Sequence, residues 1–231
     1  MGYLRRVFSA TERENCRAIL STLPPSRGGS LLDLGTHDGA FAARVAERLG
    51  SDEIFGVELI PEHAARARER GIDVVTADLE SGIPFEDDRF DVVHTNQVIE
   101  HLRATDTFLS EIRRVLRPGG LACISTNNLS SWHNVVSMAA GLQPMPMHIS
   151  DDVILGNPLN PEHGLPHSDH GRVHVRLFTP RALTELCEHH GLRRVAMRAA
   201  GYYPLPPRLA RGALRLDPLH GAFLIGLFQR T

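Results

Sequence analysis

Residues 31–41 read LLDLGTHDGAF, and this stretch decides the fold. The apolar run at 30–34 leads into a turn that carries Gly35 and Gly39. Phe41, Val45 and Leu49 then recur at helical spacing, before a glycine that is typical of a helix end. The stretch therefore predicts a buried strand, a tight turn and a helix.

The same alternation of strand and helix patterns continues along the chain to residue 126. Strands are predicted at 30–34, 54–59, 72–76, 90–95, 121–126, 192–197 and 222–229. Alternating strands and helices favour right-handed crossovers and a parallel sheet with helices on both faces, and the last two strands suit an antiparallel hairpin. The predicted fold class is α/β, a Rossmann-like doubly wound seven-stranded sheet, mostly parallel, with an antiparallel C-terminal edge hairpin.

We expect one domain over residues 1–231, because this length favours a single large core. Residues 1–28 are expected to supply a helical cover, mostly Thr11 to Leu23, over the sheet or its ligand side. The alternation breaks at 127–178, where five prolines fall, together with His148, His163, His167, His170 and His174. That segment suits a substrate-side insertion or lid, or a structural connector.

Composition excludes several classes of function. All 25 basic residues are Arg, so chemistry that needs a lysine, as in Schiff bases and phosphate loops, is impossible. The three cysteines are widely spaced, which favours reduced thiols, and no apolar run is long enough to cross a bilayer. We expect a cytoplasmic protein without a membrane partner, and a net charge of -2 gives no global attraction to nucleic acid.

Polar residues follow four of the predicted strands, where an open parallel sheet binds its ligands. Gly35 and Gly39 permit close approach of a ligand to the backbone. Glu58 offers two acceptors for ribose hydroxyls, although a solvated carboxylate is an equal interpretation. Residues 78–79 suit an adenine ring, and residues 96–97 would face the reactive part of a cofactor.

These strand ends, with four ordered motifs, resemble the class I S-adenosylmethionine-dependent methyltransferases, in the small-molecule branch with the ubiquinone-pathway O-methyltransferases. The motifs are LDLG at 32–35, FDVV at 90–93, VIEHL at 98–102 and LRPGG at 116–120. The resemblance covers roughly 31–126 and continues more weakly through 174–180. It implies an enzyme that uses S-adenosyl-L-methionine as its cofactor.

The resemblance also implies a cofactor site. Asp33, Gly35 and Gly39 would line the methionine moiety, Glu58 would hold the ribose, and Asn96 would lie below the sulfonium. Adenine would fall to Asp78 and Leu79, and the predicted set is completed by Thr36, His37, Leu59 and Gln97. His37 departs from the family, which has a small residue there. A nicotinamide enzyme is the weaker alternative, because only the first glycine of G-x-G-x-x-G is present.

Methyl transfer from a sulfonium needs alignment, and a hydroxyl acceptor must also lose its proton. His101 and His174 are the candidate general bases, with structural hydrogen bonding as the alternative. In the ubiquinone-pathway enzymes and the small-RNA 2′-O-methyltransferases, the matching Glu-x-x-Glu-His motif holds a divalent metal. Here Gln97 replaces the first carboxylate, so we predict no metal, although Glu100, His101 and His174 remain capable ligands.

The leading hypothesis is methyl transfer to a small-molecule acceptor, with a hydroxyl oxygen preferred. His37 and Gln97 motivate an alternative, a catalytically silent binding module that keeps the methyltransferase fold. RNA 2′-O-methylation is a third hypothesis, and it would use Arg193, Arg194, Arg198, Arg208, Arg211 and Arg215. Prolines interrupt that stretch, so a solvated loop is the simpler interpretation, and nucleic acid is not expected as a partner.

Overall fold

The computed structural model describes residues 2–167 and 173–231. Its strands are β1 (Ser30–Leu34), β2 (Glu53–Glu58), β3 (Asp73–Thr76), β4 (Phe90–Asn96), β5 (Leu116–Asn127), β6 (Leu192–Ala200) and β7 (Phe223–Arg230). Its α-helices are α1 (Tyr3–Thr22), α2 (Ala40–Leu49), α3 (Pro61–Glu69), α4 (Thr105–Val115), α5 (Trp132–Ala139), α6 (Pro180–His189) and α7 (Pro207–Leu216). Short 3₁₀ helices lie at Leu79–Ser81 and Ile99–His101.

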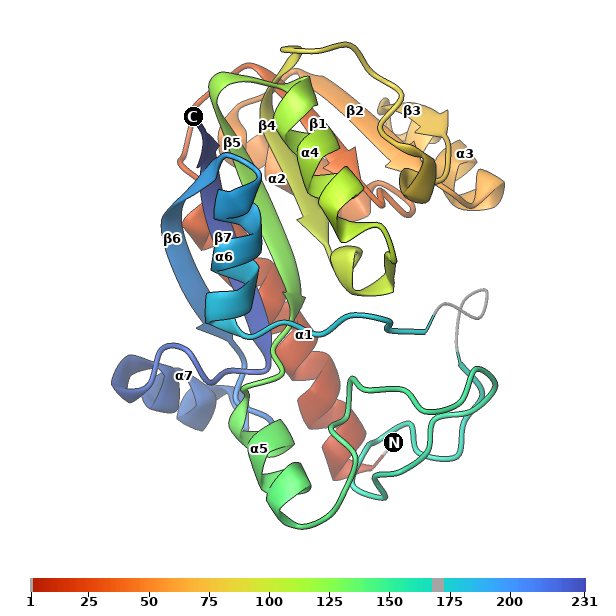
Figure 1. The fold of residues 1–231 in the computed structure, drawn as a ribbon, viewed down its shortest axis with the longest axis vertical. Helices are drawn as coiled ribbons and strands as arrows, with labels where there is room; N and C mark the ends of the chain where they lie inside the picture. The colour runs from red at the N-terminus through yellow and green to blue at the C-terminus, as the bar shows by residue number, and fades with distance from the viewer. Residues whose placement is uncertain (1, 168–172) are drawn as a thin grey trace.

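The strands form one sheet in the order β3-β2-β1-β4-β5-β7-β6 (Figure 1). The first five pair in parallel, whereas β7 runs antiparallel to both β5 and β6. The chain order reverses between β1 and β4, which is where doubly wound sheets bind ligands. The predicted seven-stranded, mostly parallel α/β fold with an antiparallel C-terminal hairpin is confirmed.

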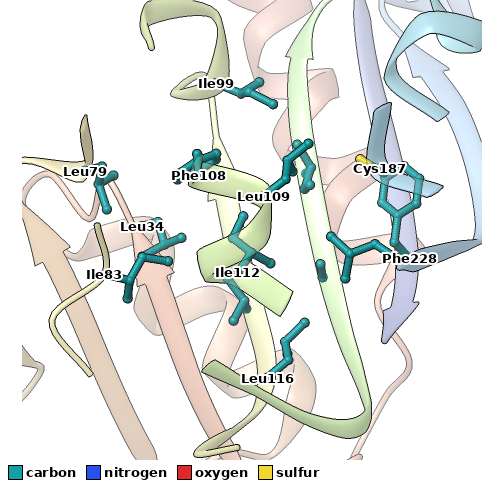
Figure 2. Packing of buried hydrophobic residues seen from close by; sticks show 14 of the residues in the cluster. Leu34, Leu79, Ile83, Ile99, Phe108, Leu109, Ile112, Leu116, Cys187 and Phe228 are labelled. Atoms are coloured by element: carbon teal, nitrogen blue, oxygen red, sulfur yellow. The ribbon is translucent and has the colours of Figure 1, made fainter. Parts of the chain in front are cut away.

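Apolar side chains cover both faces of the sheet. Leu32 and Leu34 of β1 pack in one cluster with α4 and α6, and Figure 2 shows Phe108, Leu109 and Ile112 of α4 over the strands. Leu31 points the opposite way, into a cluster that contains residues of α1 and α2. Successive strand residues thus serve opposite faces, as burial on both sides of a parallel sheet requires.

Two helices lie where the sequence predicts none. α5 falls inside 127–178, and α7 replaces the expected loop between the last two strands. β5 also begins at Leu116, because that residue already pairs with Phe90 of β4 directly after α4 ends. Within the described residues, none of the helices has the length and apolar character needed to cross a membrane.

Candidate active site

A cavity of about 650 Å³ lies outside the carboxyl ends of the parallel strands. Each of the four predicted strand ends contributes two residues to its lining: Gly35 and His37, Glu58 and Leu59, Asp78 and Leu79, and Asn96 and Gln97. His101 and His174 line the same cavity. The fold therefore gathers eight of the eleven predicted cofactor residues and both predicted bases around one space.

The other three predicted residues, Asp33, Thr36 and Gly39, lie in and beside the turn that joins β1 to α2. Thr36 Oγ1 donates a hydrogen bond to the Asp33 carbonyl over 2.7 Å. The Asp33 carboxylate lies 2.5 Å from Nδ1 of His94, on neighbouring β4, and both side chains are buried. Gly39 precedes α2, where a Cβ would lie 2.6 Å from Cδ1 of Ile72. These residues shape the turn without lining the cavity.

Gly35 brings the backbone of the turn up to the cavity. Its φ is +78°, and a Cβ at this position would lie 2.5 Å from Cγ2 of Val98. Any side chain here would be strained in conformation and would collide with its neighbour. The missing Cβ lets Val98, which also lines the cavity, pack directly against the turn.

Glu58 presents a fixed carboxylate at the end of β2. Oε2 accepts a hydrogen bond from the His37 backbone N–H at 2.8 Å, and Oε1 accepts one from Ile60 at 2.9 Å. Each oxygen keeps a further lone pair for a ligand hydroxyl. The His37 side chain is 59% exposed, and its ring lies tilted by 47° against that of His63, with 4.0 Å between ring centroids. The departure at His37 thus keeps the backbone hydrogen bond to Glu58.

α1 reaches the cavity through Asn15, which sequence reasoning missed. Asn15 Nδ2 donates to Oδ1 of Asn96 at 3.0 Å, and Asn15 Oδ1 accepts from the Ser125 hydroxyl at 3.0 Å. Gln97 follows in a left-handed conformation, with φ of 57°. Its Nε2 is buried and has no hydrogen-bond partner within the described residues, so it is a donor available to a ligand.

Glu100, His101 and His174 meet beside these strand ends, with one ligand atom of each lying within 4.8 Å of the others. Glu100 is fully buried, and its carboxylate accepts hydrogen bonds from the Thr126 hydroxyl at 2.8 Å and the Asn127 amide at 3.3 Å. Burial raises the pKa of the Glu100 carboxyl to about 7. Three such donors suit one metal ion, and the absence of metal stays a prediction.

The two histidines share a tautomer. His174 Nδ1 lies 2.8 Å from the Pro146 carbonyl, and His101 Nδ1 lies 3.3 Å from the Val173 carbonyl. A carbonyl only accepts, so each Nδ1 carries the proton and each Nε2 keeps a lone pair. Burial and the neighbouring histidines lower the pKa of His174 to about 3, so its ring is neutral at physiological pH.

Segment 127–178 supplies further lining residues besides His174. His148 stacks on His174 with 4.4 Å between ring centroids, and the ring centroids of His148 and His167 are also 4.4 Å apart. Glu162 also lines the cavity, whereas the exposed His163 does not. His170 lies outside the described residues. The density of histidines in this segment was the available signal, but only the fold shows which of them converge.

The basic C-terminal stretch lies away from the cavity. Arg193, Arg194 and Arg198 belong to β6, and Arg208, Arg211 and Arg215 belong to α7. None of these six arginines lines the cavity.

Comparisons with known proteins agree with this geometry. A family model described as "Methyltransferase domain" matches residues 32–124. The chain is 30% identical over 193 residues to a Mycobacterium ulcerans protein named "Probable phthiotriol/phenolphthiotriol dimycocerosates methyltransferase 2", covering 80% of this chain and 69% of that one. It is 32% identical to the ubiquinone biosynthesis O-methyltransferase of Roseobacter denitrificans, covering 47% of this chain and 45% of that one.

Two further curated relatives are longer, and the chain spans 36% and 19% of their lengths. Among solved structures, an S-adenosylmethionine-dependent methyltransferase from Mesorhizobium loti superposes with a TM-score of 0.62 at 19% identity, covering 93% of this chain and 96% of that one. That structural similarity concerns the fold alone, and the family assignment rests on the sequence relatives. The chain belongs to the class I S-adenosylmethionine-dependent methyltransferases.

Proposed function

We propose that this protein transfers a methyl group from S-adenosylmethionine to a hydroxyl oxygen of a small molecule. The observation that best supports this function is the cavity itself. The four strand-end pairs and the two histidines, His101 and His174, line one continuous space. The similarity to a ubiquinone biosynthesis O-methyltransferase supports an oxygen acceptor.

The residues present fit the cofactor. Glu58 would accept hydrogen bonds from the ribose hydroxyls, because two backbone N–H groups already hold its carboxylate in place. Asp78 and Leu79 would flank the adenine, and the backbone of Gly35, which lines the cavity, would approach the methionine moiety. The bound cofactor supplies an electrophilic methyl group on a sulfonium. Asp33, Thr36 and Gly39 would act by supporting the turn.

His101 and His174 each present a lone pair on Nε2 that could take the acceptor proton, and we assign this role to His174. Its Nδ1 proton is committed to the Pro146 carbonyl, so Nε2 is the atom that would receive the hydroxyl proton. The low pKa of His174 makes this nitrogen a weak base, but Glu100, which is partly ionised near pH 7, would in its ionised form stabilise the imidazolium that forms. His101, with a ring centroid 4.8 Å from that of His174, would orient the hydroxyl.

The setting of the reaction is also a proposal. We infer a single domain over residues 1–231, with 127–178 as its acceptor side, because His148, Glu162 and His174 of that segment line the cavity. A cytoplasmic location is supported by three cysteines that are all free.

The test is transfer of labelled methyl from S-adenosylmethionine to a panel of phenols and alcohols, followed by identification of the product. We expect O-methylated product, and a loss of turnover of about 10²-fold or more in His174→Gln, the usual contribution of a general base. His163→Gln is the matched control, since this exposed histidine of the same segment does not line the cavity. Cofactor binding without transfer to any acceptor would instead support the silent module.

A further inference from the structure

The main cavity continues into a smaller lobe of about 70 Å³. Phe8, Glu162, His174 and Phe223 line both spaces, so the lobe opens from the main cavity beside His174. None of the four strand-end pairs lines it. The lobe therefore extends away from the proposed cofactor site, on the side where an acceptor would lie.

Aromatic rings from three distant parts of the chain wall the lobe. Phe8 of α1 packs edge-on against Tyr203, with 6.1 Å between ring centroids, and Phe223 comes from the start of β7. Tyr203 and Phe223 are each 5% exposed, so little water covers them. Aromatic rings attract cations by their quadrupoles, and desolvation strengthens this attraction.

Acidic side chains line this part of the cavity. Glu162 is the acidic side chain of the lobe, and no arginine among the described residues lines the lobe or the main cavity. No ion pair involves Glu162 within residues 2–167 and 173–231. Glu12 of α1 lines the adjoining wall of the main cavity, and burial together with the negative charge of Glu162 raises the pKa of Glu12.

A carboxylate beside aromatic walls is suited to an ammonium group, and it repels carboxylates and phosphates. We propose that the lobe binds the ammonium group of the methyl acceptor, with Glu162 as its counter-ion and Phe8, Tyr203 and Phe223 as its walls. This inference rests on the proposed function for the reacting hydroxyl, which lies at His174. The acceptor class is then a small hydroxy-amine, cationic at neutral pH.

The test compares matched probes by calorimetric titration of the protein saturated with S-adenosylhomocysteine. One pair is choline and 3,3-dimethylbutan-1-ol, which share a shape but differ in charge. A second set is tyramine, tyrosol and 4-hydroxyphenylacetate, in which one skeleton carries a cation, a neutral hydroxyl or an anion. We expect each cationic probe, choline and tyramine (called the amines below), to bind about tenfold or more tightly than its neutral counterpart, and the anion to bind weakest.

Glu162→Gln removes the charge and keeps the shape of the side chain. We expect the amine and the neutral probe to bind alike in this variant, with the affinity for S-adenosylmethionine unchanged. Asp151→Asn is the matched control, because Asp151 is an exposed carboxylate of the same segment that lines neither space, and it should keep the amine preference. Phe8→Leu should reduce amine binding more than neutral binding.

Three outcomes overturn the ammonium site: no binding by either amine, neutral probes that bind as tightly as the amines, or an amine preference that survives in Glu162→Gln. Failure of the proposed function gives a different result. If the amines bind with the expected preference but no probe hydroxyl is methylated, the ammonium site stands and O-methylation of these probes is contradicted. A methyl group found on nitrogen would keep the site and change the reacting atom.

Discussion

His133 is a single residue whose protonation couples to folding. Burial lowers the pKa of His133 from 6.5 to about 4. Between pH 4 and pH 6.5 the unfolded chain binds a proton at His133 and the folded chain does not. The free energy of unfolding therefore falls as the pH drops from 6.5 toward 4. The contribution of this residue is up to about 3 kcal/mol.

The measurement is urea unfolding at a series of pH values from 7 to 4. His133→Gln removes the titrating group, so we expect its free energy of unfolding to fall less on acidification than that of the unaltered protein, by up to about 3 kcal/mol. His163→Gln, an exposed control, should follow the unaltered protein. Parallel profiles for all three proteins would contradict the coupling.

Residue by residue, the sequence was informative where the fold class fixes a position. Glu58 and Asn96 were predictable, because parallel strands present their carboxyl ends at one edge of the sheet. Asp33 shows the limit of that reasoning, since its carboxylate pairs with His94 across β1 and β4. Glu162 was not predictable, because a loop conformation decides whether its side chain reaches the cavity.

At the scale of elements, α1 joins the N-terminal region to the site. The sequence predicts its core at residues 11–23, but the helix begins at Tyr3, and the added turns carry Phe8 to the cavity. Asn15 then ties the helix to Asn96 and Ser125. We therefore regard Asn15 as a positioning residue for the end of β4.

Asn15→Ala would remove the hydrogen-bond partner of the Ser125 hydroxyl and of the side-chain oxygen Oδ1 of Asn96. We expect a loss of about 1–3 kcal/mol in the free energy of unfolding and weaker binding of S-adenosylmethionine. Ser21→Ala, an exposed change on the same helix, should alter stability by less than about 0.5 kcal/mol. Unchanged cofactor affinity in Asn15→Ala, measured by calorimetry, would show that the contact does not position Asn96.

The interpretation of residues 207–216 as loop was wrong, and the reason is physical. Pro206 and Pro207 suggested irregular structure, yet proline is tolerated at the first helical position, where Pro207 begins α7. The leucines, alanines and arginines that follow are good helix formers. α5 was missed because its eight residues fall in a proline-containing segment without a long apolar period.

At the scale of the whole molecule, the alternating pattern predicted the sheet because a parallel sheet buried on both faces leaves long apolar strands separated by helices. The parallel pairing and the C-terminal hairpin followed from the rules for crossovers and hairpins. The conformation of 127–178 did not, since no periodic pattern specifies it, and that segment shapes the proposed acceptor side of the cavity. The acceptor is accordingly a proposal, while the cofactor follows from the family.

The most direct test of the central claim is calorimetric titration with S-adenosylmethionine, of the unaltered protein and of Glu58→Gln. The account predicts saturable binding at one site, weakened about tenfold or more in Glu58→Gln, because the carboxylate would lose charge-assisted hydrogen bonds to the ribose. Undiminished affinity in Glu58→Gln, or no binding by the unaltered protein, would contradict the assignment of this cavity as the cofactor site.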